Sequence, residues 1–462
     1  MKKSLIGEDF DTFLESSDWR YSAAIVGMEK FFNYFSKDQL QWRKVQDGIY
    51  YNYEDLTEER FLEFVEYYFI DDMHHKELEK LLMSDEFNED MVKQINEKMK
   101  ANSIMKKVFK NIKFDGNNSA IIQEIIEKNR KVLIKDTFKN KNNLYKNYCN
   151  TSSLLQEKGQ CCRLVGYSVD MNKKGKSISY NFDKINYVYE DEIEMDFLPM
   201  GFSNGRQGYF INSNSTVENL IRTNSTFNSK ITKAKELASA NKDDDGYKNT
   251  NLNDSKKILF NSIINTDDFI NYDVEVIMKN VENDFFETIY IRDESIKNLK
   301  KIKDFYDVFM YSKKISDGYW IDIYDEVINC ILNNIRTDKL IEIFIKSNER
   351  EYMVSRLISV NLIIENGGKD MEDKIKSAYG TAKNIAEEMQ ENKLMSYKHK
   401  LASALIFRDY DRYCDILMKL STEINKPLNF AFDLFEDFEG NKDVAYSFVN
   451  ALSKKEERKS EE

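Results

Sequence analysis

The spacing of hydrophobic residues changes along this sequence, and that change constrains the fold more than any other feature. In residues 371–391 the apolar positions recur at steps of 4, 3, 4, 3 and 4, which places them on one stripe of a helix. An apolar run over 339–365 ends at Gly367 and Gly368, and glycine commonly terminates a helix. Further helical patterns cover 394–408, 410–425, 429–438 and 441–452. The sequence therefore predicts an all-helical bundle over 349–462, ending in a disordered charged tail.

The pattern before this bundle is mixed. From about 163 to 217, short runs of alternating apolar and polar residues indicate strands and hairpins. Nearer the start, residues 20–36 and 55–82 have apolar positions at helical spacing. We therefore expect an α+β fold, with short antiparallel strands and helices in a domain over 1–348, followed by the helical bundle.

A proline- and glycine-rich stretch follows the strand region. It opens at Pro199, one of only two prolines, and leads to a short strand expected at Tyr209–Asn212. A helix should begin near Ser215 or Thr216, because a hydroxyl side chain with Glu218 close behind is a typical N-terminal cap.

The charge balance limits the classes of function. The chain has 68 Lys and Arg against 80 Asp and Glu, a formal net charge of −12, which excludes a uniformly basic coat for nucleic acid. Residues 93–146 carry a net positive charge, unlike the chain as a whole, with 14 Lys or Arg and 5 Asp or Glu. The segment forms either solvated helix faces or a local contact for a polyanion.

Hydrophobic residues make up 41% of the chain and aromatic residues 13%, which is too much for a disordered protein. No stretch approaches the roughly 18 apolar residues of a membrane span. We expect a cytoplasmic protein whose five cysteines are reduced.

The sequence offers few groups for common catalytic mechanisms. It has three histidines, no GxxxxGK[ST] loop and no HExxH motif. A metal-dependent nuclease using Asp71, Asp72, His74 and His75 is one alternative, although acids beside histidines in one charged helix more often form a solvated face.

The cysteine region spans 149–162. Cys149 lies twelve residues before the adjacent Cys161 and Cys162, whereas a structural zinc site usually takes two close cysteine pairs. Three thiols with an unidentified fourth ligand could bind zinc, but buried inert cysteines are the more common case. We predict no stoichiometric zinc and no other cofactor.

Three stretches resemble a known family: DWRYSAAIVGMEKFF, LPMGFSNGRQGYFINSNSTVENL and YKHKLASALIFRDYDRYCDILMKLSTEINKPLNFAFDLF. Together with the mid-chain cysteines and the terminal bundle, they resemble the large subunit of type I CRISPR Cascade complexes, in the type I-B family named for CXXC-CXXC. The chain departs from this family in its cysteines, because the two CXXC pairs are reduced to Cys149 and Cys161-Cys162.

The resemblance implies a non-catalytic subunit of an RNA-guided complex. Such a subunit reads the protospacer-adjacent motif on target duplex DNA, stabilises the R-loop and recruits a separate helicase-nuclease, while base pairing supplies most of the sequence specificity. The implied partners are guide RNA, target double-stranded DNA, the backbone and handle-binding subunits, and the helicase-nuclease. In several similar systems the small subunit arises by internal translation. Met353 and Met371 stand where a chain of about 90–110 residues, an ordinary domain size, could begin.

The nucleic-acid contacts implied by this resemblance fall into three groups. Phosphate attraction is assigned to Lys106, Lys107, Lys110 and Lys113. Motif reading or contacts to the RNA handle are assigned to Asn204, Arg206, Gln207, Asn212 and Asn214. Holding the displaced DNA strand is assigned to Lys398, Lys400, Arg408 and Arg412. Two other classes stay open: the metal-dependent nuclease, and a purely structural helical scaffold that binds only protein.

Overall fold

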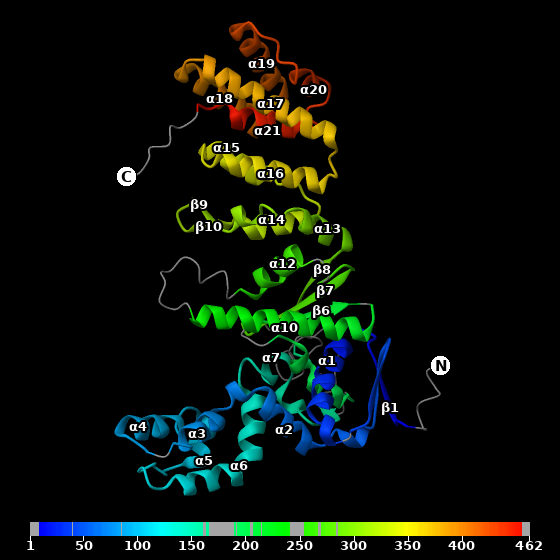
Figure 1. Ribbon diagram of the computed structural model, residues 1–462, viewed down its shortest axis with the longest axis vertical. Coiled ribbons are helices and arrows are strands. Elements are labelled where there is room, and N and C mark those ends of the chain that lie inside the picture. The colour runs from blue at the N-terminus through cyan, green and yellow to red at the C-terminus, as the bar shows by residue number, and fades with distance from the viewer. Residues whose placement is uncertain are drawn as a thin grey trace, which may run out of the picture. The chain divides into compact units, whose positions relative to one another are not determined.

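The computed structural model describes residues 9–38, 40–84, 86–159, 163–165, 189–190, 192–203, 207–213, 215–240, 254–266, 269–282 and 285–454. The chain forms two compact units: unit 1 comprises Met1–Leu259 with Asp273–Tyr290, and unit 2 comprises Phe260–Tyr272 with Ile291–Glu462. Short antiparallel sheets and helices make up unit 1, and unit 2 is mainly helical (Figure 1). The expected α+β fold class is confirmed.

Helix α1 (Trp19–Tyr34) lies at the centre of unit 1. It begins after Asp18, whose carboxylate accepts a hydrogen bond from the Arg20 backbone N–H at 2.8 Å. A Cβ at Gly27 would lie 2.1 Å from the Phe197 carbonyl oxygen. Because glycine has no side chain to clash here, α1 packs directly on the backbone of two elements distant in the sequence, η5 (Ile193–Phe197) and α9 (Leu198–Gly201).

The strands in the described part of unit 1 form two three-stranded sheets and a two-stranded one. The first has the order β1-β3-β2 and is antiparallel throughout, with strands Thr12–Glu15, Gly48–Tyr51 and Trp42–Val45. The second has the order β6-β7-β8, with strands Gln207–Ser213, Val274–Asn280 and Glu287–Ile291. The third pairs β4 (Lys158–Gly159) with β5 (Tyr189–Glu190). The strand expected at Tyr209–Asn212 lies within β6, so that prediction is confirmed.

Helix α10 (Val217–Ala240) is fixed to the second sheet. It begins where the sequence predicts, and the Thr216 hydroxyl accepts a hydrogen bond from the Asn219 N–H at 3.2 Å. Further along the helix, Asn224 accepts from the Ile211 N–H at 2.9 Å and donates to the Ile211 carbonyl at 2.8 Å. This buried amide pairs with both backbone groups of one β6 residue, so α10 cannot slide along the sheet.

Most of the basic segment folds into a helical subdomain of unit 1. Its elements are α3 (His74–Leu82), α4 (Glu89–Lys98), α5 (Ser103–Phe109) and the first part of α6 (Ser119–Asn140) (Figure 1). They enclose a separate core made of Leu78, Leu82, Ile95, Met99, Met105, Phe109, Phe114, Ile122, Ile126 and Leu133.

The helix expected over 55–82 is interrupted. The structure forms α2 (Glu58–Tyr68), a short turn η3 (Ile70–Asp72) and then α3. The reason is that the two halves bury different cores: Phe61 and Val65 of α2 belong to the main core of unit 1, whereas Leu78 of α3 belongs to the subdomain core. The remaining short elements of unit 1 are η1 (Ser36–Asp38), η2 (Tyr53–Asp55), α7 (Tyr145–Tyr148) and η4 (Thr151–Ser153).

Unit 2 begins within helix α12 (Ser255–Asn265), through which the division between the units passes. Its middle part contains α13 (Asp293–Lys301), η6 (Tyr306–Phe309), the antiparallel hairpin of β9 (Ser312–Ser316) and β10 (Tyr319–Asp322), and α14 (Ile323–Leu332). The helices that follow are α15 (Asp338–Ser347), α16 (Glu351–Ile364), α17 (Lys369–Glu388), α18 (Glu391–Ile406), α19 (Tyr410–Ile424), α20 (Ala431–Glu436) and α21 (Lys442–Ala451).

The helical bundle pattern is largely confirmed. Ala378, Ala382 and Ile385 of the predicted stripe are buried, and α17 packs against α21. The run over 339–365 is two helices instead of one, because Asn348 and Arg350 adopt positive φ angles of 51° and reverse the chain between α15 and α16.

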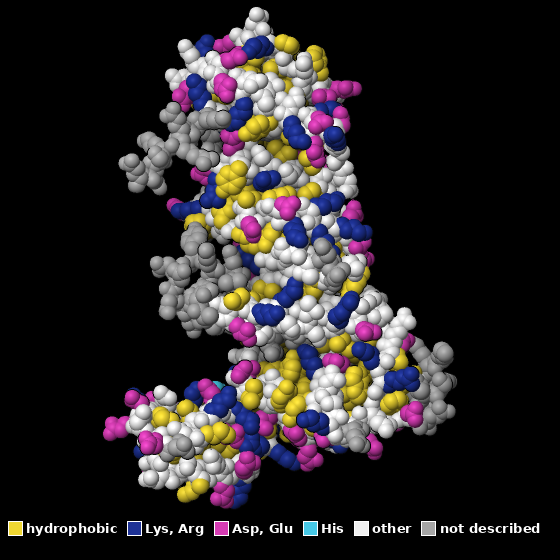
Figure 2. All heavy atoms as spheres, in the orientation of Figure 1, with side chains coloured by type: hydrophobic (Ala, Val, Ile, Leu, Met, Phe, Trp, Pro, Cys, Tyr) yellow, Lys and Arg dark blue, Asp and Glu magenta, His cyan; other side chains and the backbone are white. Residues whose placement is uncertain are grey.

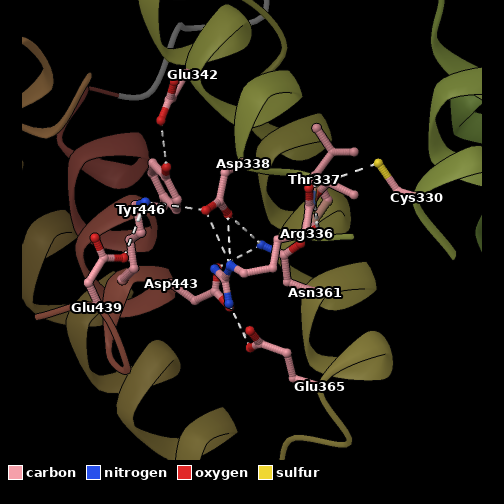
Figure 3. Close-up of polar contacts among 12 residues, drawn as sticks. Cys330, Arg336, Thr337, Asp338, Glu342, Asn361, Glu365, Glu439, Asp443 and Tyr446 are labelled. Carbon is pink, nitrogen blue, oxygen red and sulfur yellow. Dashed lines mark hydrogen bonds and ion pairs between the residues drawn. The ribbon is translucent and has the colours of Figure 1, made fainter. Parts of the chain in front are cut away.

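A polar network joins three helices of unit 2 (Figure 3). Arg336 pairs with Asp338 at 3.0 Å, Glu365 at 2.6 Å and Asp443 at 2.7 Å. Asn361 of α16 donates to Asp443 at 3.0 Å and accepts from the Thr337 N–H at 2.7 Å. Burial raises the pKa of Asp443 to about 6 despite the nearby guanidinium. The network holds α15, α16 and α21 in register.

The compact units do not divide the chain at the expected boundary of 348/349. Residues 291–348 belong to unit 2 together with the predicted bundle, and Arg336 and Asp338 share the network with Asp443. The independence of residues 349–462 stays a prediction. Among the described residues, no helix combines the length and apolarity that a membrane span requires.

Candidate nucleic-acid interface

A groove of about 750 Å³ lies between α1, α2 and α10 of unit 1. We call it the α1–α10 groove. Its lining residues come from three segments that are distant in the sequence: Lys30, Asn33, Tyr34, Phe64, Tyr67, Tyr68, Ser225, Asn228, Ser229, Ile231, Thr232, Lys233, Lys235 and Glu236. The volume falls within the range of roughly 300–1,000 Å³ that is usual for ligand clefts.

Aromatic side chains of α1 and α2 form one wall. The rings of Tyr34 and Tyr67 lie 4.5 Å apart at an interplanar angle of 33°, and Tyr67 is 58% exposed. Phe64 is buried behind them, with its ring centre 5.9 Å from that of Tyr34. The Tyr34 hydroxyl donates to Glu63 at 3.2 Å. The exposed ring of Tyr67 therefore packs on Tyr34, which is itself held by buried Phe64 and by its hydrogen bond to Glu63.

The wall from α10 is polar. The hydroxyls of Ser229 and Thr232 donate to carbonyls one turn earlier, at 3.0 and 3.1 Å, so their oxygens keep acceptor capacity. The Asn228 side chain makes no hydrogen bond within the described ranges, and exposed Lys233 makes no ion pair there. This wall offers donors, acceptors and a positive charge to a ligand.

Lys30 supplies a further positive charge from the aromatic side. Its Nζ donates to the Met200 carbonyl at 2.6 Å and to the Tyr68 hydroxyl at 2.8 Å, and it lies 5.0 Å from the Tyr68 ring centre. Both acceptors are neutral, so they fix the ammonium group without cancelling its charge. Lys235 completes the basic lining, and burial lowers its pKa.

This arrangement suits a single-stranded nucleic acid. Exposed aromatic rings stack on bases without regard to sequence, lysines attract phosphates, and hydroxyl and amide groups bind base or sugar edges. Three lysines and one glutamate line the groove, so its local charge is opposite in sign to that of the whole chain.

The lysines predicted to attract phosphate lie on the helical subdomain. Lys106, Lys107, Lys110 and Lys113 are all exposed, and none makes an ion pair within the part of the chain that the structure describes. Other bases of the segment are paired instead: Arg130 with Glu66 and Glu79, Lys131 with Glu59, Lys135 with Glu58, and Lys141 with Asp72. Figure 2 shows basic and acidic side chains interspersed over the face drawn. Four unpaired lysines of the segment therefore lie on or just after α5, while Lys93, Lys100, Lys128, Lys139 and Lys146 also make no ion pair among the described residues.

The four residues of the nuclease alternative do not converge. His75 is buried and its Nε2 lies 2.7 Å from Glu66 Oε1, while Asp72 accepts a hydrogen bond from Lys141 at 2.6 Å. His74 lies 3.9 Å from Glu77, and burial lowers its pKa. Within the described ranges, no group of three or more His, Cys, Asp or Glu side chains could hold a metal ion.

The motif-reading residues are only partly described. Asn204, Arg206 and Asn214 lie outside the described residues. Gln207 opens β6, opposite Asn280. Asn212 is 2% exposed and donates to Glu275 at 2.9 Å. Because Asn212 is buried and its amide is bonded to Glu275, its placement argues against a base-reading role, which we do not retain.

The four predicted basic residues of the bundle differ in exposure. Lys400, Arg408 and Arg412 are exposed, as a strand-holding role requires. Lys398 is buried, with 7% of its surface exposed. It follows Leu394 by one helical turn on the inner face of α18, so it is not the surface contact that the sequence suggests.

Cys149 is buried in the main core of unit 1, and its backbone bridges to Leu164. Cys161 and Cys162 lie outside the described residues. The expectation of no stoichiometric zinc therefore stays a prediction.

Sequence reasoning missed the α1–α10 groove. Tyr67 is adjacent to Tyr68, which belongs to the apolar pattern of 55–82, and Lys233 lies in a helix with no unusual charge. The one signal of the groove in the sequence is the clustering of aromatic residues in FFNYF and EYYF. That clustering does not reveal the groove, because only folding brings these residues opposite α10.

The family model that matches this chain is described as CRISPR-associated protein Csx8, and it covers residues 10–452. Searches of curated proteins and of solved structures give no match.

Proposed function

Because the chain belongs to the family of CRISPR-associated protein Csx8, we propose that it is the non-catalytic large subunit of a type I CRISPR RNA-guided complex, of subtype I-B. The family match over nearly the whole chain carries this proposal. As such a subunit, the protein reads the protospacer-adjacent motif on duplex DNA, stabilises the R-loop and recruits a helicase-nuclease. Its partners are guide RNA, target DNA and the other subunits of the complex.

We further propose that the α1–α10 groove binds a single-stranded segment of the nucleic acid. Tyr67 stacks on a base, Lys30 and Lys233 attract phosphates, and the polar side chains of α10 contact base or sugar edges. The lysines of α5 add attraction for the phosphate backbone that does not depend on sequence.

Substitution of Tyr67 tests the groove directly. Tyr67→Ala should weaken binding of a fluorescent single-stranded oligonucleotide by about 1–3 kcal/mol, because it removes one stacking ring. Tyr67→Phe keeps the ring and should bind like the natural protein. Fluorescence anisotropy with the full chain measures both affinities. If Tyr67→Ala binds as tightly as Tyr67→Phe, the groove is not the binding site.

The non-catalytic assignment has its own test. Purified protein incubated with magnesium or manganese should leave single- and double-stranded DNA intact. Metal-dependent cleavage that Asp72→Ala or His74→Ala abolishes would establish the nuclease alternative. The protein-only scaffold alternative predicts no DNA or RNA shift at all, and a gel shift with duplexes that differ only in a few flanking base pairs separates it from motif reading.

A further inference from the structure

Unit 2 contains a cavity of about 490 Å³ that the proposed function does not use. It lies between the end of α15, the start of α16, and helices α17, α18 and α21. We call it the Lys398 pocket, after one of its lining residues. The apolar part of its lining comes from Phe344, Ile345, Leu394 and Met395.

Lys398 is the most unusual residue of this pocket. Its side chain is more than nine-tenths buried, yet in the described part of the chain it makes neither a hydrogen bond nor an ion pair. Burial is the main cause that lowers its pKa. The charge of Glu351 acts in the opposite direction on this pKa, although Glu351 makes no ion pair with Lys398. The Lys398 side chain lines the cavity.

The N-terminus of α16 faces the same cavity. Its capping residue is Arg350, in the left-handed conformation with φ at 51°, and no side chain caps the helix. A cation at a helix N-terminus opposes the helix dipole, because that end carries partial positive charge. The Arg350 guanidinium lies 4.1 Å from the Tyr311 ring centre, and its Nη1 donates to the Tyr352 hydroxyl at 3.5 Å. Its other N–H groups remain as donors for an acceptor in the pocket.

The acidic residues of the lining are mostly occupied. Glu351 accepts from Lys383 at 2.8 Å, from Tyr379 at 2.9 Å and from Ser453 at 3.2 Å. Glu349 pairs with Lys313 at 2.6 Å. Among the described residues this leaves exposed Glu391 as the one acid of the lining without an ion pair. Glu351 also acts electrostatically on Lys398, and Glu349 on Arg350. The lining holds four Lys or Arg and three Glu, so Lys398, Arg350 and the α16 N-terminus meet at one cavity with a small excess of positive charge.

We propose that the Lys398 pocket is a binding site for a phosphate group. Lys398 supplies an ammonium group that makes no hydrogen bond in the described part of the chain, Arg350 supplies guanidinium donors, and α16 supplies N–H groups of its first turn. The phosphate comes either from the end or backbone of a nucleic-acid strand or from free phosphate. The proposal rests on unit 2 alone and does not depend on the α1–α10 groove.

The test uses the full chain and calorimetric titration with three probes: the phosphorylated dinucleotide pTpT, unphosphorylated TpT and inorganic phosphate. All titrations are carried out in the Tyr67→Ala background, which weakens binding in the α1–α10 groove and is the same for every variant compared. We expect pTpT to bind, and Lys398→Met and Arg350→Asn each to weaken it by about tenfold or more, because each removes charge-assisted hydrogen bonds. Asn is chosen because it accepts the left-handed backbone and can cap a helix.

Lys419→Met is the matched control, because Lys419 lies in the same unit on α19, is exposed and does not line the pocket. It should bind pTpT like the parent chain. Lys398→Met should melt at the same or a higher temperature, since it removes a buried charge, and loss of binding cannot then be ascribed to unfolding. Equal affinity for pTpT and inorganic phosphate supports a free-phosphate site, whereas preference for pTpT or TpT supports a strand site. The proposal fails if no probe binds at millimolar concentration, or if Lys398→Met and Arg350→Asn bind like the control.

Discussion

At the scale of single residues, buried charges fix the segments that surround the core of unit 1. Arg163 and Asp196 form an ion pair with almost no exposure. Asp196 also accepts from the Tyr145 hydroxyl at 2.6 Å and from the Leu155 N–H at 2.7 Å. The Asp196 carboxylate therefore joins the region around Cys149 to η5. Because η5 packs against α1, it also supports the α1–α10 groove.

We predict that Arg163→Met lowers the free energy of unfolding of unit 1 by about 3–5 kcal/mol, because it leaves Asp196 buried without a cation. Urea unfolding followed by tryptophan fluorescence measures it, since Trp19 and Trp42 lie in unit 1. The double variant Arg163→Met/Asp196→Asn should recover part of the loss. A double variant less stable than the single one would contradict this role of the pair.

Glu66 is a second carboxylate with several partners. Burial alone would raise its pKa, but the His75 hydrogen bond and the Arg130 and Lys76 charges lower it to about 2. Glu66 thereby connects α2, α3 and α6, which explains why His75 is structural in this fold.

This shift predicts a dependence on pH. A carboxylate whose pKa is lower in the folded state stabilises the protein above its unfolded pKa, and that stability is lost as pH falls from about 4.5 to about 2. Glu66→Gln should be less stable than the natural chain by about 1–2 kcal/mol at pH 7, after allowance for solvent screening. Unfolding curves should show the gap closing below pH 4.5, whereas Glu59→Gln, which breaks an exposed pair, should show little gap at any pH. A gap for Glu66→Gln that stays constant with pH would exclude the mechanism.

At the scale of elements, α5 differs from α6 in whether its basic side chains form ion pairs. Several bases of α6 are paired with acids of α2 and α3, whereas Lys106, Lys107 and Lys110 are exposed and have no acidic partner in the described ranges. The sequence contains no acid between Glu97 and Asp115. The net charge counted over residues 93–146 therefore does not show that Lys106, Lys107 and Lys110 follow one another with no acid between them.

Changing Lys106, Lys107 and Lys110 together to Glu should weaken binding of the assembled complex to all duplexes about equally. Phosphate contacts carry no sequence information, and the slope of log affinity against log salt should flatten by about 0.9 for each phosphate that is no longer neutralised. A triple change of Lys44, Lys369 and Lys419, which are exposed and unpaired among the described residues, matches the change in net charge and should have little effect. Equal loss of affinity in both triples would mean that net charge, and not α5, controls binding.

Base reading makes a different prediction for Gln207, which opens the strand after the glycine-rich stretch. Gln207→Ala should weaken motif-bearing DNA selectively, by about 1–3 kcal/mol, because it removes the amide that would bond to a base edge. The measurement is a competition between duplexes with and without the motif. Uniform weakening of both duplexes would place Gln207 with the phosphate-binding residues.

At the scale of the whole molecule, the expected internal start of a small subunit meets a structural constraint. A chain beginning at Met353 keeps nearly all of α16, whereas one beginning at Met371 loses it, and α21 packs against α16 as well as α17. Both chains lack Arg336, a partner of Asp443.

We therefore predict that a short product, if it is made, begins at Met353. Intact-mass spectrometry of complex expressed from this gene should show it beside the 54.7 kDa chain. Met353→Leu, which conserves side-chain volume, should abolish it, while Met371→Leu should not. If only the full chain appears, or if the short band persists after both substitutions, internal initiation is wrong.

The sequence by itself determined the periodic elements and the location of charge. The stripe of α17, the cap of α10 at Thr216 and strand β6 follow local rules of spacing and capping, so they could be predicted. The tertiary structure alone decided where α2 breaks from α3, which lysines are paired, and that Lys398 and Asn212 are buried. It also decided that Tyr34 and Tyr67 face α10 across a groove. The physical reason is that burial and pairing depend on what lies across the core, and a side chain's partner is set by the packing of distant segments and not by its neighbours in sequence.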